Sequence, residues 1–429
     1  LKFCKIIEAA VVEVVLLCVT TNITAHSRYV CEVKVNFITT DFEVTNKRVF
    51  LLGDHSVGKT TLSGVLIKDL SDDGYGRSRM GLFNHVHEIK CGHTSSLAYH
   101  LIGFSKNGDL LNDKNCATKE DICARAQTTF TLIDSCGSHK YIDTTLNGLT
   151  CHYPHIIFLL INIHHPISHI DFLKISLSWD SQTIILLTHC DLSNDEEIFD
   201  SFIIIRDAIR EFSTKTAKLV TSSIELSEFQ DQIENLEMVP VIPISNVTQK
   251  NIDLVHQFLK NFTMSSTSHS SSLLESRAEF IINDFYHVPG TGMVVSGILL
   301  CGTMKENDDV YFGPINQKFY QFQVLSLKRF NLPCKILYPG QFATVAVNTL
   351  QTFKNKLKRG SYLLSCGNPE LRASFLAVIK CKYSLVASLT GSIGLLYIGN
   401  FQTSAVINHV SLTENVDDIQ DITVSLLIS

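Results

Sequence analysis

The chain has 429 residues, enough for about three domains with separate cores. Hydrophobic residues make up 45% of it and charged residues 18%, which excludes an intrinsically disordered protein. The net charge of −6 argues against broad electrostatic binding to nucleic acid, although a local basic face stays compatible with it. The 13 cysteines form no Cys-x-x-Cys pair, and we interpret them as reduced cytosolic thiols, with disulfides or zinc sites as alternatives.

We assign residues 1–45 to an N-terminal extension. Its apolar stretch, 6–18, is interrupted by Glu8 and Glu13, whereas a membrane-spanning helix needs about twenty apolar residues with few charges. A buried helix or strand is our interpretation, and a secretion signal is the alternative. We therefore expect a cytoplasmic protein without a membrane partner.

The stretch Val49–Leu62 places an apolar strand before the motif Gly-x-x-x-x-Gly-Lys-Thr and a helical pattern after it. Its two glycines allow a tight turn whose N–H groups converge on phosphate oxygens, and the helix directs its positive end at the same anion. Lys59 is predicted to reach the β- and γ-phosphates, and the Thr60 hydroxyl to hold Mg²⁺. An ordinary glycine-rich turn is the alternative. The predicted nucleotide-binding residues of this loop are Gly53, Asp54, His55, Ser56, Val57, Gly58, Lys59, Thr60 and Thr61.

Over residues 46–263, short apolar runs alternate with longer amphipathic stretches. This alternation predicts an α/β P-loop NTPase domain, doubly wound around a mostly parallel sheet, with its ligand at the carboxyl ends of the strands. The predicted buried parallel strands include Phe130–Ile133, Ile156–Ile163, Thr183–Leu187 and Val239–Ile244, and the predicted helices include Ile198–Phe212 and Asn251–Phe262.

A Ser/Thr-rich linker, 264–275, separates this domain from short β-rich segments with Pro-Gly turns. Their spacing predicts a β-barrel domain over 276–365. A second β-rich stretch, 370–429, is short for a closed barrel, so we expect a truncated barrel domain. The chain also begins with Leu1, and we expect it to be incomplete at both ends. The segments of the first barrel are Ala278–Phe285, Gly292–Leu299, Asp309–Phe312, Tyr320–Phe330 and Gln341–Val347.

Two polar segments are candidates for sensing the γ-phosphate. The segment Phe130–Gly137 ends a strand in Asp-x-x-Gly, which would place the Asp134 carboxylate near Mg²⁺ and the Gly137 N–H near the γ-phosphate. In the loop Gly92–Ser96, Thr94 is a candidate for a second Mg²⁺-binding hydroxyl, because switch loops order in this way around a triphosphate. A plain polar loop is the alternative.

The segment Thr183–Asp191 ends in a candidate for base recognition. The Asp191 carboxylate can accept hydrogen bonds from N1 and N2 of guanine, whereas adenine presents an acceptor there and leaves the charge unpaired. Ser245 and Asn246 follow another strand and would brace the base through backbone and hydroxyl groups. A helix N-cap is the alternative role of Asp191.

These motifs carry a family resemblance, and the segment Asp72–Ser96 is the most specific part of it. Its sequence, DDGYGRSRMGLFNHVHEIKCGHTSS, is similar without gaps to DNGRG…R..LFRHKHEI..GRTSS of the GTP-binding protein 1/2 family. These proteins are translational GTPases related to elongation factor Tu and elongation factor 1-alpha. The resemblance covers about Val49–Val347 well and the C-terminal stretch loosely. Other similar blocks are Lys140–Thr145, Ile244–Thr248 and Ala278–Gly297.

The resemblance implies a monomer that binds Mg-GTP and hydrolyses it to GDP and phosphate, thereby switching its contacts with the ribosome, tRNA or the RNA-decay machinery. It implies that Thr94 is the switch-one threonine and that Thr60, Thr94 and, through water, Asp134 hold Mg²⁺. The implied guanine pocket comprises Thr188, His189, Asp191, Ser245 and Asn246. The implied catalytic residues are Lys59, Thr94, Gly137 and His139.

Four departures from the family pattern affect catalysis more than binding. Ser138 stands where the family has the histidine that orients the attacking water, and His139 lies one residue later, on a different side of the backbone. His189 replaces the lysine of the base-reading motif. Ser56 replaces an aspartate of the phosphate loop, and His93 replaces the arginine beside the switch-one threonine.

Two alternatives to an active GTPase remain, of which the first follows from Ser138 and His189 and the second is weaker. The first is a catalytically impaired pseudo-GTPase that acts as a nucleotide-dependent scaffold, and the second is a P-loop ATPase or kinase. We do not expect the cluster His85, His87 and Glu88 to bind zinc, because a fourth ligand is lacking.

Overall fold

The computed structural model divides into two units, Leu1–Glu43 and Val44–Ser429. In the first unit, β1 (Leu17–Thr20) and β2 (Tyr29–Glu32) pair antiparallel. Most of the apolar stretch 6–18 and of the predicted linker 264–275 lies outside the described residues. The structure describes 17–20, 29–32, 45–83, 85–92, 94–166, 168, 170–230, 237–264, 276–315, 318–348, 360–365, 369, 374–382, 390–416 and 419–428.

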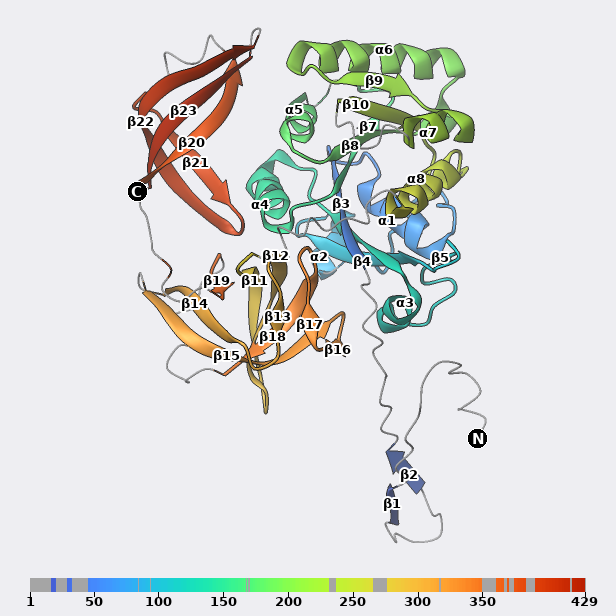
Figure 1. Cartoon of the computed structure of the whole chain (residues 1–429). Helices are drawn as coiled ribbons and strands as arrows, with labels where there is room; N and C mark the ends of the chain where they lie inside the picture. The colour runs from blue at the N-terminus through green and yellow to red at the C-terminus, as the bar shows by residue number, and fades with distance from the viewer. Residues whose placement is uncertain are drawn as a thin grey trace. The chain divides into compact units, whose positions relative to one another are not determined.

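The second unit begins with an eight-stranded sheet in the order β5-β4-β6-β3-β7-β8-β10-β9 (Figure 1). The run from β6 to β9 in this order is parallel, and β4 and β5 are antiparallel additions at one edge. The strands are β3 (Thr45–Gly53), β4 (Ala98–Phe104), β5 (Leu110–Leu111), β6 (Thr128–Asp134), β7 (Ile156–Asn162), β8 (Gln182–Thr188), β9 (Thr216–Leu219) and β10 (Met238–Pro243). The predicted doubly wound, mostly parallel sheet is confirmed.

Helices cover both faces of this sheet because its central strands are apolar on both faces. In β3, Val49 and Leu51 point into one core, whereas Phe50 and Leu52 point into the other. The first core is closed by α1 (Lys59–Lys68), α7 (Ser223–Gln230) and α8 (Ile252–Met264). The second core is closed by α4 (Ile142–His152), α5 (Ile170–Ser178) and α6 (Asp195–Phe212).

Helix α6 begins three residues before the predicted start at Ile198. Asn194 accepts a hydrogen bond from the Glu197 amide, and the Glu197 carboxylate accepts one from the Asn194 amide. This capping box fixes the first turn independently of the apolar pattern. Two short helices flank the sheet, α2 (Val86–Cys91) and α3 (Lys119–Arg125).

The chain continues into a closed β-barrel, which confirms the predicted barrel fold. The strands pair in the order β14-β19-β11-β12-β18-β15, and β15 returns to β14. They are β11 (Glu279–Val288), β12 (Gly292–Cys301), β14 (Asp309–Ile315), β15 (Lys318–Arg329), β18 (Phe342–Val347) and β19 (Tyr362–Leu364), with β16 (Leu332–Cys334) added beside β15. A further small pair joins β13 (Met304–Lys305) to β17 (Ile336–Leu337).

The C-terminal strands form a four-stranded antiparallel sheet in the order β20-β23-β22-β21. They are β20 (Ser374–Lys382), β21 (Ile393–Ile398), β22 (Phe401–Val416) and β23 (Ile419–Ile428). In the described residues, β20 and β21 are the edges of this sheet.

A buried histidine at the end of α4 contributes a pH dependence to the stability of this unit. The exposed fraction of His152 is 2%. Its Nδ1 accepts from the side-chain amide of Asn283 in β11 at 3.3 Å, and its Nε2 lies 2.9 Å from the Tyr99 hydroxyl. Burial, together with the charge of Arg48, lowers the pKa of His152 to about 3.

We expect acid to destabilise the fold through His152, because the unfolded chain binds a proton near pH 6.5 and the folded chain does not. Above pH 6.5 the titration of His152 does not lower the free energy of unfolding. At pH 5 it lowers the free energy of unfolding by about 2 kcal/mol. Denaturant unfolding at the two pH values measures this loss. We expect His152→Gln to reduce it and the exposed-site control His287→Gln to retain it. An unchanged loss in His152→Gln would contradict the assignment.

Candidate nucleotide-binding site

The predicted phosphate loop connects β3 to α1 at the carboxyl edge of the sheet. Gly53 and Gly58 have φ angles of 145° and 93°, in a region that L side chains rarely adopt. A Cβ added to Gly53 would also overlap the Leu160 carbonyl of the neighbouring strand. Both glycines are therefore required by the turn itself.

The Lys59 ammonium lies inside this turn. Its Nζ donates to the Gly53 carbonyl at 2.8 Å and to the Asp54 carbonyl at 2.6 Å, and only 6% of the residue is exposed. Burial lowers the pKa of Lys59 to about 8, against the opposing charges of Asp134 and Asp54. A Cβ added to Gly137 would overlap this Nζ, so Gly137 is packed directly against the lysine. The phosphate loop and the Asp-x-x-Gly motif are therefore in direct contact.

Three oxygen-bearing side chains converge beside the start of α1. The Thr60 hydroxyl donates to Asp134 Oδ2 at 2.6 Å and lies 2.8 Å from the Thr94 hydroxyl. Asp134 is fully buried, and its Oδ1 has no hydrogen-bond partner among the described residues. Burial raises the pKa of Asp134 to about 6, despite the hydrogen bond from Thr60.

A buried carboxylate oxygen is costly unless it accepts a hydrogen bond or binds a cation. A hard divalent cation such as Mg²⁺ prefers carboxylate, hydroxyl and water oxygens. The donor set of Thr60, Thr94 and Asp134 therefore fits Mg²⁺.

The base-recognition candidates are brought together by β8 and β10. Ser245 is buried after β10, and its hydroxyl donates to Asp191 Oδ1 at 2.7 Å. The same hydroxyl accepts from the amides of Val247 at 3.2 Å and Thr248 at 3.1 Å, so its only proton is directed at the carboxylate. Asp191 lies within a 3₁₀ turn, η3 (Cys190–Leu192), and its alternative role as a helix N-cap does not occur.

His189 precedes this carboxylate with a positive φ of 66°. Its Nδ1 lies 3.0 Å from the hydroxyl of the buried Thr188. Burial lowers the pKa of His189, despite the nearby charge of Asp191. The lowered pKa favours the neutral imidazole at neutral pH. The position that carries a lysine in the related family is therefore uncharged here.

Asn246 links the base-recognition loop to the phosphate loop. Its side-chain amide donates to the Gly58 carbonyl at 3.5 Å, and its Oδ1 is buried without a partner in the described part of the chain. Its backbone carbonyl accepts from the amide of Asp72 at 2.9 Å. The loop that begins at Asp72 therefore belongs to the site, a role that the sequence analysis did not assign to it.

The Asp72 carboxylate organises that loop. It accepts from the amides of Gly74 and Gly76 at 3.0 Å each, and from the amide and hydroxyl of Ser78 at 2.8 Å each. These bonds lower its pKa against the effect of burial. The sequence signal for this loop was an aspartate followed by a small residue two, four and six positions later. Aspartate side chains in turns accept hydrogen bonds from nearby backbone amides.

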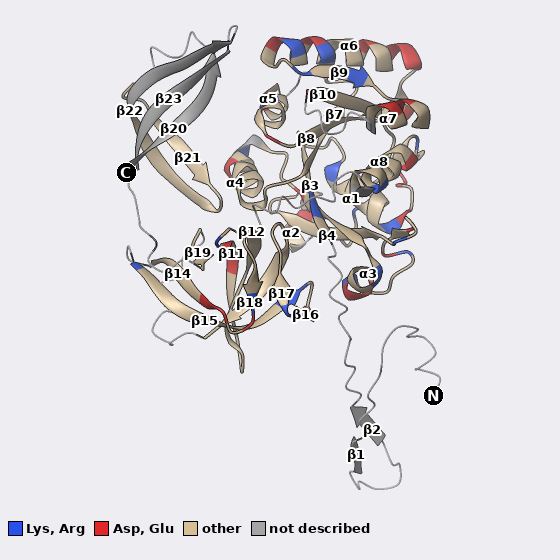
Figure 2. Cartoon of the chain, in the orientation of Figure 1, with Lys and Arg blue, Asp and Glu red and all other residues tan. Residues whose placement is uncertain are grey.

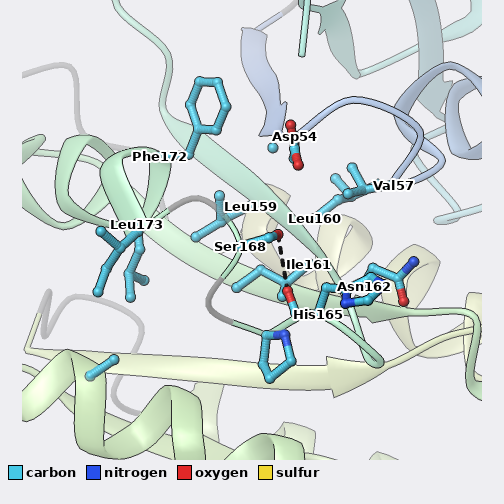
Figure 3. Close-up of a pocket in the computed structure, with 14 residues that line it drawn as sticks. Asp54, Val57, Leu159, Leu160, Ile161, Asn162, His165, Ser168, Phe172 and Leu173 are labelled. Atoms are coloured by element: carbon cyan, nitrogen blue, oxygen red, sulfur yellow. Dashed lines mark hydrogen bonds between the residues drawn. The ribbon is translucent and has the colours of Figure 1, made fainter. Parts of the chain in front are cut away.

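A cavity of about 20 Å³ lies behind the phosphate loop, between the end of β7 and α5 (Figure 3). Asp54, Asn162 and Phe172 are among its lining residues, and the Ser168 hydroxyl donates to the His165 carbonyl at its rim at 3.1 Å. A single water occupies about 10–15 Å³ by this measure. The cavity has room for a water and is too small for a purine.

Of the site residues discussed in the sequence analysis, one is described only in its backbone and one not at all. His139 begins the 3₁₀ turn η2 (His139–Tyr141), but its side chain lies outside the described residues, as does all of His93. Ser138 is half-buried, and its hydroxyl accepts from the Lys140 amide at 3.3 Å. In the phosphate loop, His55 and Ser56 are exposed, and the Ser56 hydroxyl lies 2.7 Å from His55 Nδ1.

The chain combines a phosphate loop at the carboxyl edge of a mostly parallel sheet with a following β-barrel, which is the architecture of P-loop proteins of the translational GTPase class. The chain belongs to the family of the elongation factor Tu GTP binding domain, which matches residues 45–280. This confirms the predicted domain of the elongation factor Tu type over that range.

Two relatives extend the similarity beyond this domain. The chain is 28% identical to GTP-binding protein 2 of Homo sapiens over 393 residues, which is 89% of this chain and 64% of the relative. It is 31% identical to GTP-binding protein 1 of Xenopus laevis over 348 residues, 79% of this chain and 52% of the relative. The resemblance to the GTP-binding protein 1/2 family is confirmed, and the chain spans less than two thirds of the length of these relatives.

Solved structures confirm the fold. A bacterial selenocysteine-specific elongation factor, EF-Sec, matches 90% of this chain and 55% of its own, with a TM-score of 0.60 and 16% identity. The Ski7 GTPase-like domain of S. cerevisiae, bound to GDP and inorganic phosphate, matches 90% of each chain with the same TM-score and identity.

Proposed function

We propose that this chain binds Mg-GTP and hydrolyses it to GDP and phosphate, and that this reaction switches its contacts with a ribosome-, tRNA- or RNA-associated partner. The convergence of Thr60, Thr94 and Asp134 around a buried, unsatisfied oxygen is the observation that carries the proposal. These three residues come from α1, the loop after α2 and the end of β6, so a bound triphosphate would hold separate segments together.

Each residue has a distinct task in this reaction. Lys59 stabilises the negative charge on the β- and γ-phosphates, because its ammonium is already desolvated. Gly137 lets the backbone approach the phosphate-binding lysine, where any larger residue would overlap it. Thr60 and Thr94, with Asp134 through water, would hold Mg²⁺, which supplies charge neutralisation on the phosphates.

Asp191 selects guanine in this proposal. The Ser245 hydroxyl holds one carboxylate oxygen, so the carboxylate is oriented before the base arrives. Thr188, His189 and Asn246 complete the proposed guanine pocket, and Asn246 also contacts the phosphate loop through the Gly58 carbonyl. The preference for GTP over ATP follows from the donors that guanine presents to a carboxylate.

A pseudo-GTPase scaffold is the second candidate, and Ser138 favours it. Ser138 stands directly after Gly137, where a histidine would orient the attacking water, and a serine hydroxyl reaches less far. Multiple-turnover phosphate release, measured with and without ribosomes, separates the two candidates. Stoichiometric GTP binding without ribosome-stimulated phosphate release would contradict the enzyme proposal and support the scaffold.

We expect Ser138→His to increase the rate of GTP hydrolysis by about 100-fold, because it restores an imidazole where it can orient water. Single-turnover phosphate release measures the change without interference from product release. Ser227→His, at an exposed position of α7, is the matched control and should leave the rate unchanged. A rate that Ser138→His does not increase would remove Ser138 as the cause of impaired catalysis.

Charge limits where an RNA partner would bind. The helix α6 carries Asp195, Glu196, Glu197, Asp200, Asp207 and Glu211 against Arg206 and Arg210. Figure 2 shows red and blue together toward one end of α6 and red alone toward the other, where 195–200 carry four carboxylates without a Lys or Arg and would repel a phosphate backbone. We propose that any RNA contacts lie away from α6. We also propose that the protein is cytoplasmic and monomeric. In the described residues, no helix has the length and hydropathy needed to cross a membrane.

A further inference from the structure

The short helix α2 carries a buried carboxylate that none of the tasks above uses. The exposed fraction of Glu88 is 1%, whereas its neighbours Val86 and Ile89 are 69% and 56% exposed. A buried carboxylate is costly unless hydrogen bonds satisfy it. The partners of Glu88 therefore indicate why it is retained.

Both oxygens of Glu88 accept hydrogen bonds from the segments on either side of α2. Oε1 accepts from the Ser95 amide at 2.7 Å, the Ser95 hydroxyl at 2.8 Å and the Ser96 amide at 3.3 Å. Oε2 accepts from the His85 amide at 3.1 Å. Hydrogen bonds to a charged acceptor are stronger than those between neutral groups, so this carboxylate fastens the chain after α2 to the helix itself.

The fastened segment begins directly after Thr94. The Thr94 hydroxyl lies 2.8 Å from that of Thr60, the proposed Mg²⁺ ligand at the start of α1. Glu88 holds the next residue through both its amide and its hydroxyl, so Thr94 has little freedom to leave. Glu88 does not itself touch the phosphate loop through any of these bonds.

We propose that Glu88 is a positioning residue that holds Thr94 in the geometry needed for a triphosphate, and so sets how strongly the site prefers GTP to GDP. The inference rests on the proposed function, because it requires Thr94 to contact Mg²⁺ and the γ-phosphate. GDP lacks that phosphate, so its binding does not depend on Thr94. Loss of Glu88 therefore weakens triphosphate binding selectively.

The test compares Glu88→Ala and Glu88→Gln with the wild-type chain. Fluorescent GDP and a fluorescent non-hydrolysable GTP analogue are titrated in Mg²⁺, with thermal unfolding recorded in parallel. We expect Glu88→Ala to weaken the analogue by about 10- to 100-fold, with the affinity for GDP unchanged within about twofold. Glu88→Gln should lie between, because its single amide oxygen still accepts while its NH₂ group faces donors.

Glu225 offers a matched control. Its Oε2 accepts from the amide and hydroxyl of Thr221 at 2.7 and 3.2 Å and from the Ser222 amide at 3.1 Å, the same kind of contact at the start of α7. Glu225→Ala should leave the ratio of the two affinities unchanged, even where it lowers the unfolding temperature.

Equal weakening of both nucleotides by Glu88→Ala, or no change in either, would overturn the inference while leaving the proposed function in place. If Glu88→Ala does not fold, Glu88→Gln decides the question, since it must weaken the analogue more than GDP. Failure of the wild-type chain to bind either nucleotide would instead contradict the proposed function, and the inference with it.

Discussion

Lys59→Met is expected to abolish useful GTP binding and at the same time to stabilise the nucleotide-free chain. The ammonium contacts the inside of the phosphate loop through the Gly53 and Asp54 carbonyls. Its removal takes away charge-assisted hydrogen bonds to two phosphates, which corresponds to a loss of about 100-fold or more in affinity.

The free energy of unfolding of the nucleotide-free chain is expected to rise, in contrast to the GTP affinity, because the same ammonium is buried. A pKa lowered from 10.5 to about 8 means that the folded chain holds this charge at a cost of about 3 kcal/mol at pH 7. Each of the two carbonyls that loses its donor offsets about 1 kcal/mol of that cost, which leaves a net gain of about 1 kcal/mol. The cost disappears as pH rises from 8 to 10.5, because the folded chain then releases the proton before the unfolded chain does.

Nucleotide titration and denaturant unfolding of the same protein preparation measure both effects. The control Lys305→Met removes an exposed lysine from the barrel and should change neither quantity. A Lys59→Met chain that binds GTP normally would contradict the assigned role of the lysine. A less stable chain would contradict the cost of burying it.

Asp191→Asn is expected to remove most of the discrimination between GTP and ATP. The carboxylate can accept from two donors of guanine, and a neutral amide offers one oxygen in its place, so we expect a loss of about 100-fold in the ratio of affinities. The ratio is measured by competition of ATP against GTP for the site. Asp195→Asn, at the exposed start of α6, removes a nearby carboxylate and should leave the ratio unchanged.

Ser245→Ala tests the orientation of that carboxylate separately. Its hydroxyl is fixed by two amides and donates to Asp191, so its loss should reduce the discrimination less than loss of the carboxylate itself. A ratio that Asp191→Asn leaves unchanged would show that another group reads the base.

The parts of the site that could be predicted from the sequence are those with a local pattern. The apolar run before Gly53 and the spacing from Gly53 to Thr60 specify a strand, a turn and a helix together, and the structure has all three. The strand that ends at Asp134 was predicted in the same way, from the apolar run before Asp-x-x-Gly. Its neighbours in the sheet were predicted because strands buried on both faces are continuously apolar.

The contacts that were missed depend on residues brought together by tertiary structure. Glu88 and Ser95 lie in a segment with mixed polar residues, and no periodicity there indicates that the carboxylate is buried. The antiparallel strand β4 pairs with β6 across more than twenty residues of intervening chain, which turn signals alone do not specify. The contact between Asp72 and Asn246 joins positions far apart in the sequence, so only the folded chain shows it.

We propose that the phosphate loop and the Asp191 carboxylate together hold a guanine nucleoside triphosphate. Equilibrium binding of GTP and of ATP to the purified wild-type chain, each with and without Mg²⁺, tests it most directly. We expect one GTP per chain, a preference over ATP of about 100-fold, and a clear loss of GTP affinity when Mg²⁺ is removed. Equal or tighter binding of ATP, or no retention of GTP in the presence of Mg²⁺, would contradict it.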